Sequence, residues 1–355
     1  AAEGDKVDAF YCGTPDHTHA VITAAALKKK KHVMCVKPLT RTIHESRTIS
    51  ALAREARVAT QVTAQPNTSE PSCRIMEAID SGILGLVREV HIWTNRPVWP
   101  QGMERPEGED PVPSTLDWNL WLGPAPFRPF KSTWPEGHLA LKQVGTNGRG
   151  VYHPFNFRGW WDFGTGSLGD MGCHYFNTPF RALKLKHPTS IHASATRSLP
   201  ETAPLACCVT YEFAAREGLP PVRVVWYDGG LKPVYPRELN GAKLPAEGVL
   251  YVGDEAKMLN TEILDETRRA KLASIPRTLP RRSGTWGEWY EACTGGEAAG
   301  CNFDIAEPLT EAVLLGNIAI RSGKWLAWDG VKGEFTNEKD ANKFLQEKYR
   351  DGWEM

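Results

Sequence analysis

The chain has 355 residues, and its 42 Lys and Arg side chains are balanced by 42 Asp and Glu, which leaves no net charge. This length exceeds one typical domain and predicts two domains that share an interface. The charge balance, without a basic stripe, argues against a nucleic-acid partner. No apolar run reaches the roughly 18–20 residues that a membrane span needs, so no membrane partner is expected either.

The first 84 residues alternate between short apolar runs and segments with hydrophobic residues at helical spacing. Such apolar runs, bounded by Gly, Pro or polar residues, predict buried strands. Buried strands that alternate with helices are typical of a parallel α/β sheet, so residues 1–84 should form part of a doubly wound (Rossmann) sheet. The predicted strands are 7–14, 32–38 and 58–65, and the predicted helices are 17–31, 43–56 and 69–82.

The pattern changes after Gly85, and residues 85–355 predict a larger α+β domain with a wide, mostly antiparallel sheet. Residues 86–95 alternate in polarity, as in a half-exposed antiparallel strand. Residues 97–158 are rich in Pro, Gly and Trp and lack periodicity, which predicts an elaborated loop region packed on its own aromatic side chains. Further strands are predicted at 189–197, 205–215, 222–228, 248–254 and 324–329, and helices at 167–186, 285–294, 305–323 and near 337–348.

The cysteines and histidines do not predict a metal site. None of the eight cysteines forms a CxxC pair, and several lie in strand-like runs, as buried reduced thiols do. His17 and His19 flank Thr18 and could suggest a metal, but no third ligand lies nearby in the sequence. We therefore expect no metal.

The segment WWDFGTGSLGDMGCHYF contains a Gly-x-Gly-x-x-Gly pattern at 164–169. A dinucleotide fingerprint requires a buried strand before the first Gly and an acid about 20 residues downstream. Residues 158–163 do not form such a strand, and the downstream position carries Lys184, Lys186 and His187. The pattern instead predicts a tight turn that opens a helix.

Three features carry candidate chemistry. The loop TPDHTHA follows the first predicted strand, and Lys37-Pro38 follows the second, so both should lie at the ligand-binding edge of the parallel sheet. Asp170 and His174 are spaced i, i+4 and share one helical face. Lys, His and a carboxylate together can remove a hydroxyl proton while a hydride leaves the same carbon. Alternatively, Lys37 extends into solvent from a strand end, Asp170 is a first-turn acid, and His174 is a core histidine.

The segments GTPDHTHAVITAAALKKKKHVMCVKPLT and LGDMGCHYFNTPFRAL resemble two motifs of the Gfo/Idh/MocA oxidoreductases: a Thr-Pro-x-x-x-His loop followed by Glu-Lys-Pro, and an Asp-x-x-x-His helix. The resemblance implies NAD or NADP as cofactor, His174 as general base, Lys37 as hydrogen-bond donor to the substrate oxygen and Asp170 as the residue that orients the substrate. The residues it places along the nicotinamide cofactor are Gly13, Thr14, Pro15, His19, Lys37 and Pro38.

Further segments, among them RGWWDFGTGSLGDMGCH and VVWYDGG, resemble a planctomycete and Bacteroidetes branch of this family. Two features depart from the family pattern. Val36 replaces the Glu before Lys-Pro, and the glycine fingerprint with its first strands and helices does not precede Val7. Either the chain is a fragment of a longer protein or it is a degenerate paralogue; the intact catalytic set favours a fragment. The branch often carries a twin-arginine signal, which favours the periplasm over the cytoplasm.

The expected activity is hydride transfer between NAD(P) and a hydroxyl carbon of a sugar, polyol or glycoside. The alternative is a non-catalytic carbohydrate-binding or assembly paralogue. Aromatic rings can stack on a pyranose while Arg and Asn bind its hydroxyls, although the tryptophans could serve only to pin the long loop. We also expect a homodimer or homotetramer that associates through the open sheet face. The predicted substrate-binding residues are Asn95, Arg96, Trp99, Tyr152, His153, Arg158, Trp160 and Trp161.

Overall fold

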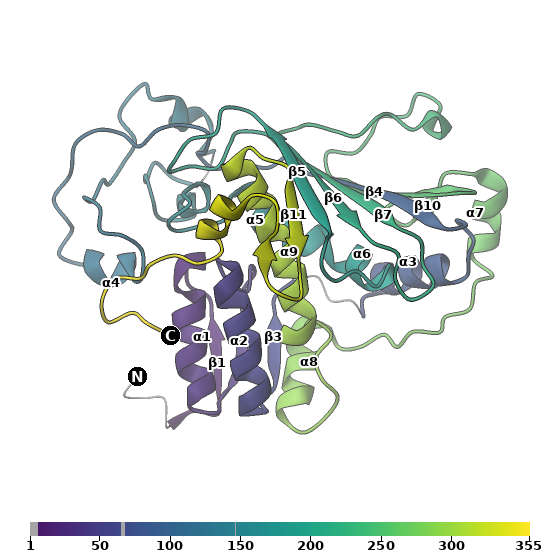
Figure 1. Cartoon of the computed structure of the whole chain (residues 1–355), viewed down its shortest axis with the longest axis horizontal. Coiled ribbons are helices and arrows are strands. Elements are labelled where there is room, and N and C mark those ends of the chain that lie inside the picture. The colour runs from purple at the N-terminus through teal and green to yellow at the C-terminus, as the bar shows by residue number, and fades with distance from the viewer. Residues whose placement is uncertain (1–5, 65–67, 146) are drawn as a thin grey trace.

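The computed structural model describes residues 6–64, 68–145 and 147–355 and contains two sheets (Figure 1). The first is parallel, with strand order β1-β2-β3. Cys12 at the end of β1 pairs in register with Cys35 of β2, and Cys35 pairs with Val62 of β3. The carboxyl ends of the three strands therefore lie at one edge. The strands are β1 (Ala9–Cys12), β2 (His32–Cys35) and β3 (Thr60–Val62), and the helices among and after them are α1 (His19–Lys28), α2 (Ile43–Ala56) and α3 (Glu70–Asp80).

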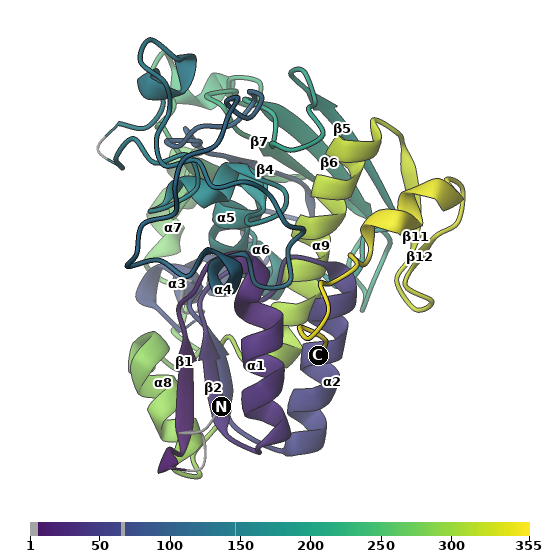
Figure 2. The same ribbon diagram turned by 90° about the vertical axis from the view of Figure 1, so that its left-hand side faces the viewer.

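Helices from distant parts of the chain cover the two faces of this parallel sheet. Figure 2 shows α1 and α2 on one side of the strands and α8 (Gly284–Cys293) on the other. The start of α2 is fixed by a capping box in which Thr42 and Glu45 satisfy each other's backbone N–H groups. Helix α1 contacts β1 and β2, and apolar residues of α1 and α2 share one core cluster with residues of both strands. Strand β2 is largely buried, as the sequence predicted, whereas Tyr11 of β1 is 52% exposed.

The second sheet has nine strands in the order β10-β9-β8-β4-β7-β6-β5-β11-β12. Only β4 and β7 pair in parallel; the other neighbours are antiparallel. The predicted α/β class with a wide, mostly antiparallel second sheet is therefore confirmed. The strands are β4 (Val87–Trp93), β5 (Ser190–Ala195), β6 (Cys207–Phe213), β7 (Val222–Tyr227), β8 (Gly248–Gly253), β9 (Lys257–Leu259), β10 (Glu262–Ile263), β11 (Leu326–Asp329) and β12 (Glu334–Phe335).

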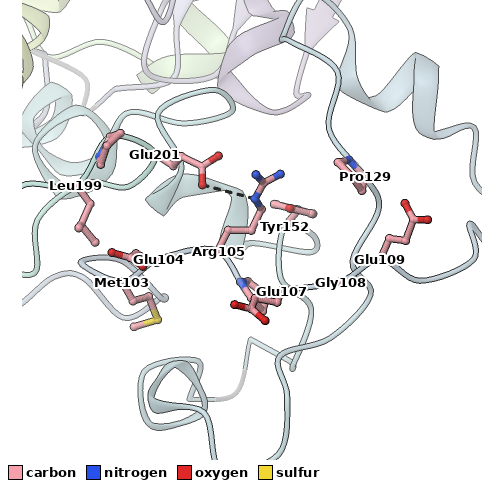
Figure 3. Close-up of a pocket in the computed structure, with 12 residues that line it drawn as sticks. Met103, Glu104, Arg105, Glu107, Gly108, Glu109, Pro129, Tyr152, Leu199 and Glu201 are labelled. Carbon is pink, nitrogen blue, oxygen red and sulfur yellow. Dashed lines mark ion pairs between the residues drawn. The ribbon is translucent and has the colours of Figure 1, made fainter.

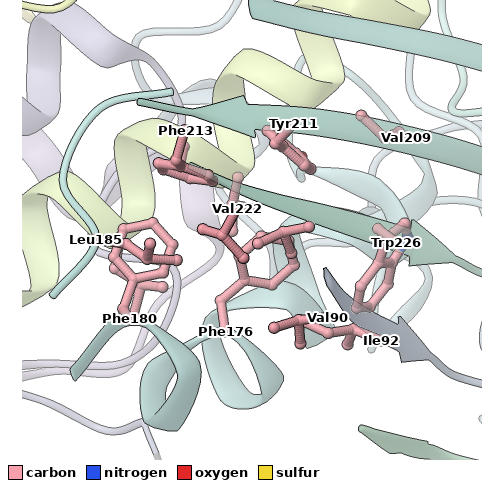
Figure 4. Packing of buried hydrophobic residues seen from close by; sticks show 14 of the residues in the cluster. Val90, Ile92, Phe176, Phe180, Leu185, Val209, Tyr211, Phe213, Val222 and Trp226 are labelled. Atoms are coloured by element: carbon pink, nitrogen blue, oxygen red, sulfur yellow. The ribbon is translucent and has the colours of Figure 1, made fainter. Parts of the chain in front are cut away.

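One face of this sheet packs on helices and forms the main core (Figure 4). Residues along β6 alternate between buried and half-buried, as expected for a strand with one covered face. Phe176 and Phe180 enter from the helices and contact aromatic side chains of the strands, with the Phe176 and Tyr211 rings 5.5 Å apart and the Phe180 and Phe213 rings 5.8 Å apart. The helices of this half are α4 (Trp118–Leu122), α5 (Gly166–Tyr175), α6 (Asn177–Ala182), α7 (Glu266–Leu272) and α9 (Phe303–Ser322).

Helix α9 joins the two halves of the molecule, because it packs against α2 on one side and against α5 and β5 on the other. Its residue Gly316 allows this close approach: a Cβ there would lie 2.0 Å from the Tyr211 hydroxyl. In the described parts of the chain, no helix is both long and apolar enough to cross a lipid bilayer.

Several elements differ from the sequence expectation. The helix predicted at 167–186 is divided at Phe176 into α5 and α6, because Pro179 has no N–H for a continuous helix but fits the first turn of a new one. The helix predicted near 337–348 is only a 3-10 segment, Lys339–Phe344. The short elements α4, α7, β9, β10 and β12 were not predicted. Gln65, the last residue of the strand predicted at 58–65, lies outside the described residues.

We expect Phe176→Ala to lower the free energy of unfolding by about 3–5 kcal/mol, because it leaves a cavity between α5 and the sheet. Phe127→Ala is the matched control, since that ring is 71% exposed. Urea unfolding followed by circular dichroism measures both variants. Equal effects of the two substitutions would show that the core is not organised around Phe176.

Candidate active site

The loops after β1 and β2 are held together by a buried histidine. The His19 ring places Nδ1 2.8 Å from the Pro38 carbonyl oxygen and Nε2 2.8 Å from the Thr14 carbonyl oxygen. His19 is fully buried, whereas Gly13 and Thr14 are exposed and Pro15 is half-buried. His19 therefore braces the loop that would face a cofactor, and Gly13 and Thr14 remain exposed beside it.

Lys37, at the end of the parallel sheet, meets Asp170 of α5 in an ion pair that joins the two halves of the molecule. Arg158 donates from Nε to the same carboxylate oxygen, Oδ1, over 2.9 Å. Burial alone would raise the pKa of Asp170, but the charges of Lys37 and Arg158 outweigh burial and hold that pKa below its ordinary value. The structure thus brings the half-buried side chains of Lys37 and Arg158 to the buried carboxylate of Asp170 in one charge cluster.

His174 lies one helical turn beyond Asp170 on α5. Burial, and after it the charge of Lys37, lower the pKa of His174 to about 4, although Asp170 and Glu247 partly oppose this shift. The imidazole is therefore uncharged at neutral pH and can accept a proton. The i, i+4 spacing correctly predicted that Asp170 and His174 share a helix.

A second polar cluster lies beside His174. The Glu247 carboxylate accepts a hydrogen bond from the Tyr175 hydroxyl at 2.6 Å and another from the buried Thr94 hydroxyl at 2.8 Å. Arg96 Nη1 lies 3.1 Å from Glu247 Oε1 and 2.7 Å from the Asn95 side-chain oxygen. Two predicted substrate residues, Asn95 and Arg96, are thus joined through Glu247 to the helix that carries His174.

Sequence reasoning missed three members of these clusters. Glu247 precedes β8 in a loop without any motif, so nothing in the sequence pointed to it. Tyr175 is adjacent to His174, and that adjacency was its only signal. Asp16 lies within the TPDHTHA loop; it is buried and accepts a hydrogen bond from Thr165 Oγ1 at 2.9 Å, which ties the loop to the residue before α5.

The aromatic residues predicted to stack on a sugar are buried in the core. Trp99, Tyr152, Trp160 and Trp161 are each at most 5% exposed. The indole of Trp160 donates to the Val151 carbonyl oxygen at 2.9 Å, and its ring packs beside that of Tyr152. The three buried tryptophans have no exposed face for a pyranose, and Tyr152 only borders a cavity of the loop region. Tyr152 and Trp160 pack in the core of the loop region, whereas Trp161 belongs to the main core. The remaining predicted residue of this segment, His153, is exposed.

A cavity of about 780 Å³ lies in the loop region (Figure 3). Arg105 and Glu201, which both line it, form an ion pair with Nε and Oε2 3.5 Å apart. Its lining does not include Lys37, Asp170 or His174, so it is separate from the charge cluster on α5. The residues around it are Met103, Glu104, Arg105, Pro106, Glu107, Gly108, Glu109, Pro129, Tyr152, Leu199, Pro200 and Glu201.

Among the described residues, one group of three side chains offers metal-ligand atoms within 4.8 Å of one another: Cys12, His19 and Cys35. Both His19 nitrogens, however, face backbone carbonyl oxygens at 2.8 Å. A metal ion would have to displace one of these hydrogen bonds and so break the brace between the two loops. The geometry therefore favours a structural role for His19. His17 is not in this group; its ring is buried, and Nε2 lies 2.9 Å from the Trp121 carbonyl oxygen.

The edge of the parallel sheet fits the nicotinamide end of a dinucleotide. Gly13 is exposed just after β1, and the Tyr11 ring packs close to it, since a Cβ at Gly13 would lie 3.0 Å from that ring. Lys37 supplies a partly exposed ammonium beside it, held by Asp170. Within the described residues no strand is followed by a Gly-x-Gly-x-x-Gly loop, so this fit concerns the nicotinamide end alone.

Two family models match the chain. Residues 1–64 match the NAD-binding Rossmann fold of the Gfo/Idh/MocA oxidoreductase family, and residues 71–214 match the C-terminal alpha/beta domain of the same family. These matches cover more than half of the chain and agree with the two sheets. The chain belongs to the Gfo/Idh/MocA family of oxidoreductases.

Similar proteins include 1-carboxy-3-chloro-3,4-dihydroxycyclohexa-1,5-diene dehydrogenase from Comamonas testosteroni, 36% identical over 24% of this chain and 21% of that protein. A 1,5-anhydro-D-fructose reductase from Ensifer adhaerens is 34% identical over 22% of this chain and 24% of its own length. The matched segments thus span less than a quarter of either relative. The WlbA dehydrogenase from Chromobacterium violaceum, solved with NADH and UDP-GlcNAcA, shares the fold with a TM-score of 0.59 at 12% identity, over 92% of this chain and 80% of that one.

We expect Lys37→Met to raise the pKa of His174 above about 4, because the substitution removes an ammonium that disfavours the charged imidazole. Carbon-13 NMR of histidine-labelled protein measures the titration, and His174→Asn assigns the signal. Lys186→Met, at an exposed position outside the cluster, is the control. An unchanged midpoint in Lys37→Met would show that Lys37 does not act on His174.

Proposed function

We propose that the protein is an NAD(P)-dependent oxidoreductase that transfers a hydride between the nicotinamide and a hydroxyl carbon of a sugar, polyol or glycoside. The observation that carries the proposal is the ion pair between Lys37, from the edge of the nucleotide-binding sheet, and Asp170, one turn before His174 on α5. His174, which can accept a proton, and the Lys37 ammonium thus lie near the ends of β1 and β2, where we expect the nicotinamide ring to bind. We assign Lys37, Asp170 and His174 as the catalytic residues.

In the oxidation direction, the uncharged His174 accepts the proton of the substrate hydroxyl. The Lys37 ammonium donates a hydrogen bond to the same oxygen and stabilises the negative charge that develops there. Asp170 orients Lys37 and provides an acceptor for a second substrate hydroxyl. When bound, the cofactor supplies the hydride acceptor. In the reduction direction the same groups return the proton to the carbonyl oxygen.

The polar cluster around Glu247 supports a polyhydroxylated substrate. Asn95, Arg96 and Glu247 offer hydrogen-bond donors and acceptors beside His174, which suits hydroxyl groups next to the reacting carbon. A relative named for its reduction of 1,5-anhydro-D-fructose is consistent with this class. We therefore assign substrate contacts to Asn95 and Arg96 and not to the four buried aromatic residues.

We expect turnover of at least one member of a panel of D-glucose, myo-inositol and 1,5-anhydro-D-glucitol with NAD⁺ or NADP⁺, followed by absorbance of the reduced cofactor. Lys37→Ala and His174→Ala should each lower turnover by about 10²–10⁴, the usual scale for positioned acid–base groups. His17→Ala should have a much smaller effect, because that ring is packed between Trp121 and Phe163.

Cofactor binding without turnover of any sugar would instead favour the non-catalytic carbohydrate-binding paralogue. A loss in His17→Ala as large as that in His174→Ala, at unchanged melting temperature, would contradict the assigned roles.

We further propose a domain boundary at residues 84 and 85 and association of copies through the face of the second sheet that the helices leave uncovered. Half-buried side chains such as His91, Thr210 and Tyr227 line this face, around a shallow hollow of about 500 Å³. A flat, partly apolar sheet face of this kind is suited to an isologous contact.

We expect size-exclusion chromatography with light scattering to give a dimer or tetramer for the wild type and a monomer for Thr210→Arg, because a buried unpaired charge opposes association. Glu107→Arg, in the loop region, should leave the assembly intact. A monomeric wild type would contradict the proposed interface.

A further inference from the structure

The sequence predicted that Arg158 binds substrate, but in the structure its guanidinium is bound to other groups of the protein. Its Nε donates to Asp170 Oδ1 at 2.9 Å, and its Nη1 donates to the Phe155 carbonyl oxygen at 3.1 Å. The guanidinium carbon lies 4.0 Å from the centre of the Phe155 ring and 4.7 Å from that of Phe157. Cation–π contacts of this kind hold a guanidinium plane in place. The side chain is therefore directed at Asp170 by its own loop.

The glycine-rich turn at 164–169 makes this placement possible. A Cβ at Gly164 would lie 2.6 Å from the Arg158 Cα, so only glycine lets the turn before α5 pass so close to the Arg158 backbone. A Cβ at Gly169 would lie 2.1 Å from Thr165 Oγ1, and that hydroxyl donates to Asp16. The turn thus packs Arg158 against the start of α5 and leaves room for Thr165 to reach the loop after β1.

The residue before Lys37 is Val36, whose apolar side chain cannot orient the lysine through a hydrogen bond or an ion pair. Its Nζ contacts Asp170 Oδ1, so the position of the ammonium depends on the position of that carboxylate. Asp170 is buried, and the second cation, Arg158, contacts the same oxygen at 2.9 Å.

We infer that Arg158 is a positioning residue, which holds the Asp170 carboxylate where it presents Lys37 to the substrate oxygen and does not itself bind the substrate. The effect of Arg158 on catalysis rests on the proposed function. The arrangement of the three side chains is independent of that function.

The groups that act on the Asp170 carboxyl come from four elements: Lys37 after β2, Arg158 in the 3-10 turn Asn156–Gly159, Asp16 in the 3-10 turn Asp16–Thr18, and His174 on α5 itself. Lys37 and Arg158 lower the pKa of Asp170 against the effect of burial. Without the Arg158 charge, only Lys37 opposes the effect of burial on the pKa of Asp170. That pKa should therefore rise, and the carboxyl group should take up a proton at a higher pH.

The test compares Arg158→Gln with Arg158→Lys in the whole protein. Carbon-13 NMR of aspartate-labelled protein follows the Asp170 carboxyl, assigned by Asp170→Asn. We expect Arg158→Gln to raise the pKa of Asp170 and Arg158→Lys to keep it below its ordinary value. Arg105→Gln, which removes an arginine in the separate loop cavity, is the matched control and should change nothing.

For a panel sugar that the wild type turns over, Arg158→Gln should lower kcat on the order of 10- to 100-fold with little change in KM, as expected for misplaced catalytic groups. Arg158→Lys should recover most of kcat.

A raised KM with unchanged Asp170 titration would overturn the inference and make Arg158 a substrate residue. If Arg158→Gln does not fold, Arg158→Lys alone tests the inference. This variant keeps the positive charge, so a raised pKa of Asp170 in it would contradict positioning of Asp170 by the charge of Arg158. A wild type without turnover on any sugar would contradict the proposed function, while the titration would still test the positioning role.

Discussion

The carboxylate of Asp170, shared by Lys37 and Arg158, is the interaction on which the rest of the site depends. Lys37 comes from the end of a parallel strand, Asp170 from a helix of the second half, and Arg158 from the loop region between them. A buried carboxylate needs such partners, since an unpaired charge in the interior is strongly destabilising. The need to pair the buried Asp170 carboxylate therefore holds the three segments together, and it also determines the geometry of the candidate active site.

Other features serve this arrangement. His19 braces the loops after β1 and β2 and so fixes the backbone from which Lys37 extends. Helix α9 packs on elements of both halves and so connects them. His174, one turn beyond Asp170, stays uncharged because burial and Lys37 disfavour its protonated form. A proton acceptor and a cation can thus lie close together without neutralising each other, which is what proton removal from a hydroxyl requires.

The strand ends and the i, i+4 pair could be predicted from the sequence because they depend on local patterns. An apolar run followed by Lys37-Pro38 places the lysine at a sheet edge, and spacing alone puts Asp170 and His174 on one helical face. Composition, in contrast, could not tell a buried tryptophan from an exposed one. Trp160 is buried because the Pro- and Gly-rich loop region, which lacks regular hydrogen bonding, needs large side chains to pack on, whereas Trp161 is buried in the main core.

Contacts between distant segments were also beyond sequence reasoning. Glu247 reaches Tyr175 and Arg96 only because β8 pairs with β4, and no motif marks that pairing. The role of Arg158 depends on the approach of Gly164, a contact that spacing does not reveal. The short strands β9, β10 and β12 carry too few residues for a period to be recognised.

The crystal structure of the protein with bound NADH tests the central claim most directly. The account predicts that the nicotinamide ring lies at the carboxyl ends of β1 and β2, beside the Lys37 ammonium and facing the helix that carries Asp170 and His174. A ring bound elsewhere, for example in the cavity beside Tyr152, or a Lys37 that has left Asp170 and points away from the ring, would contradict it.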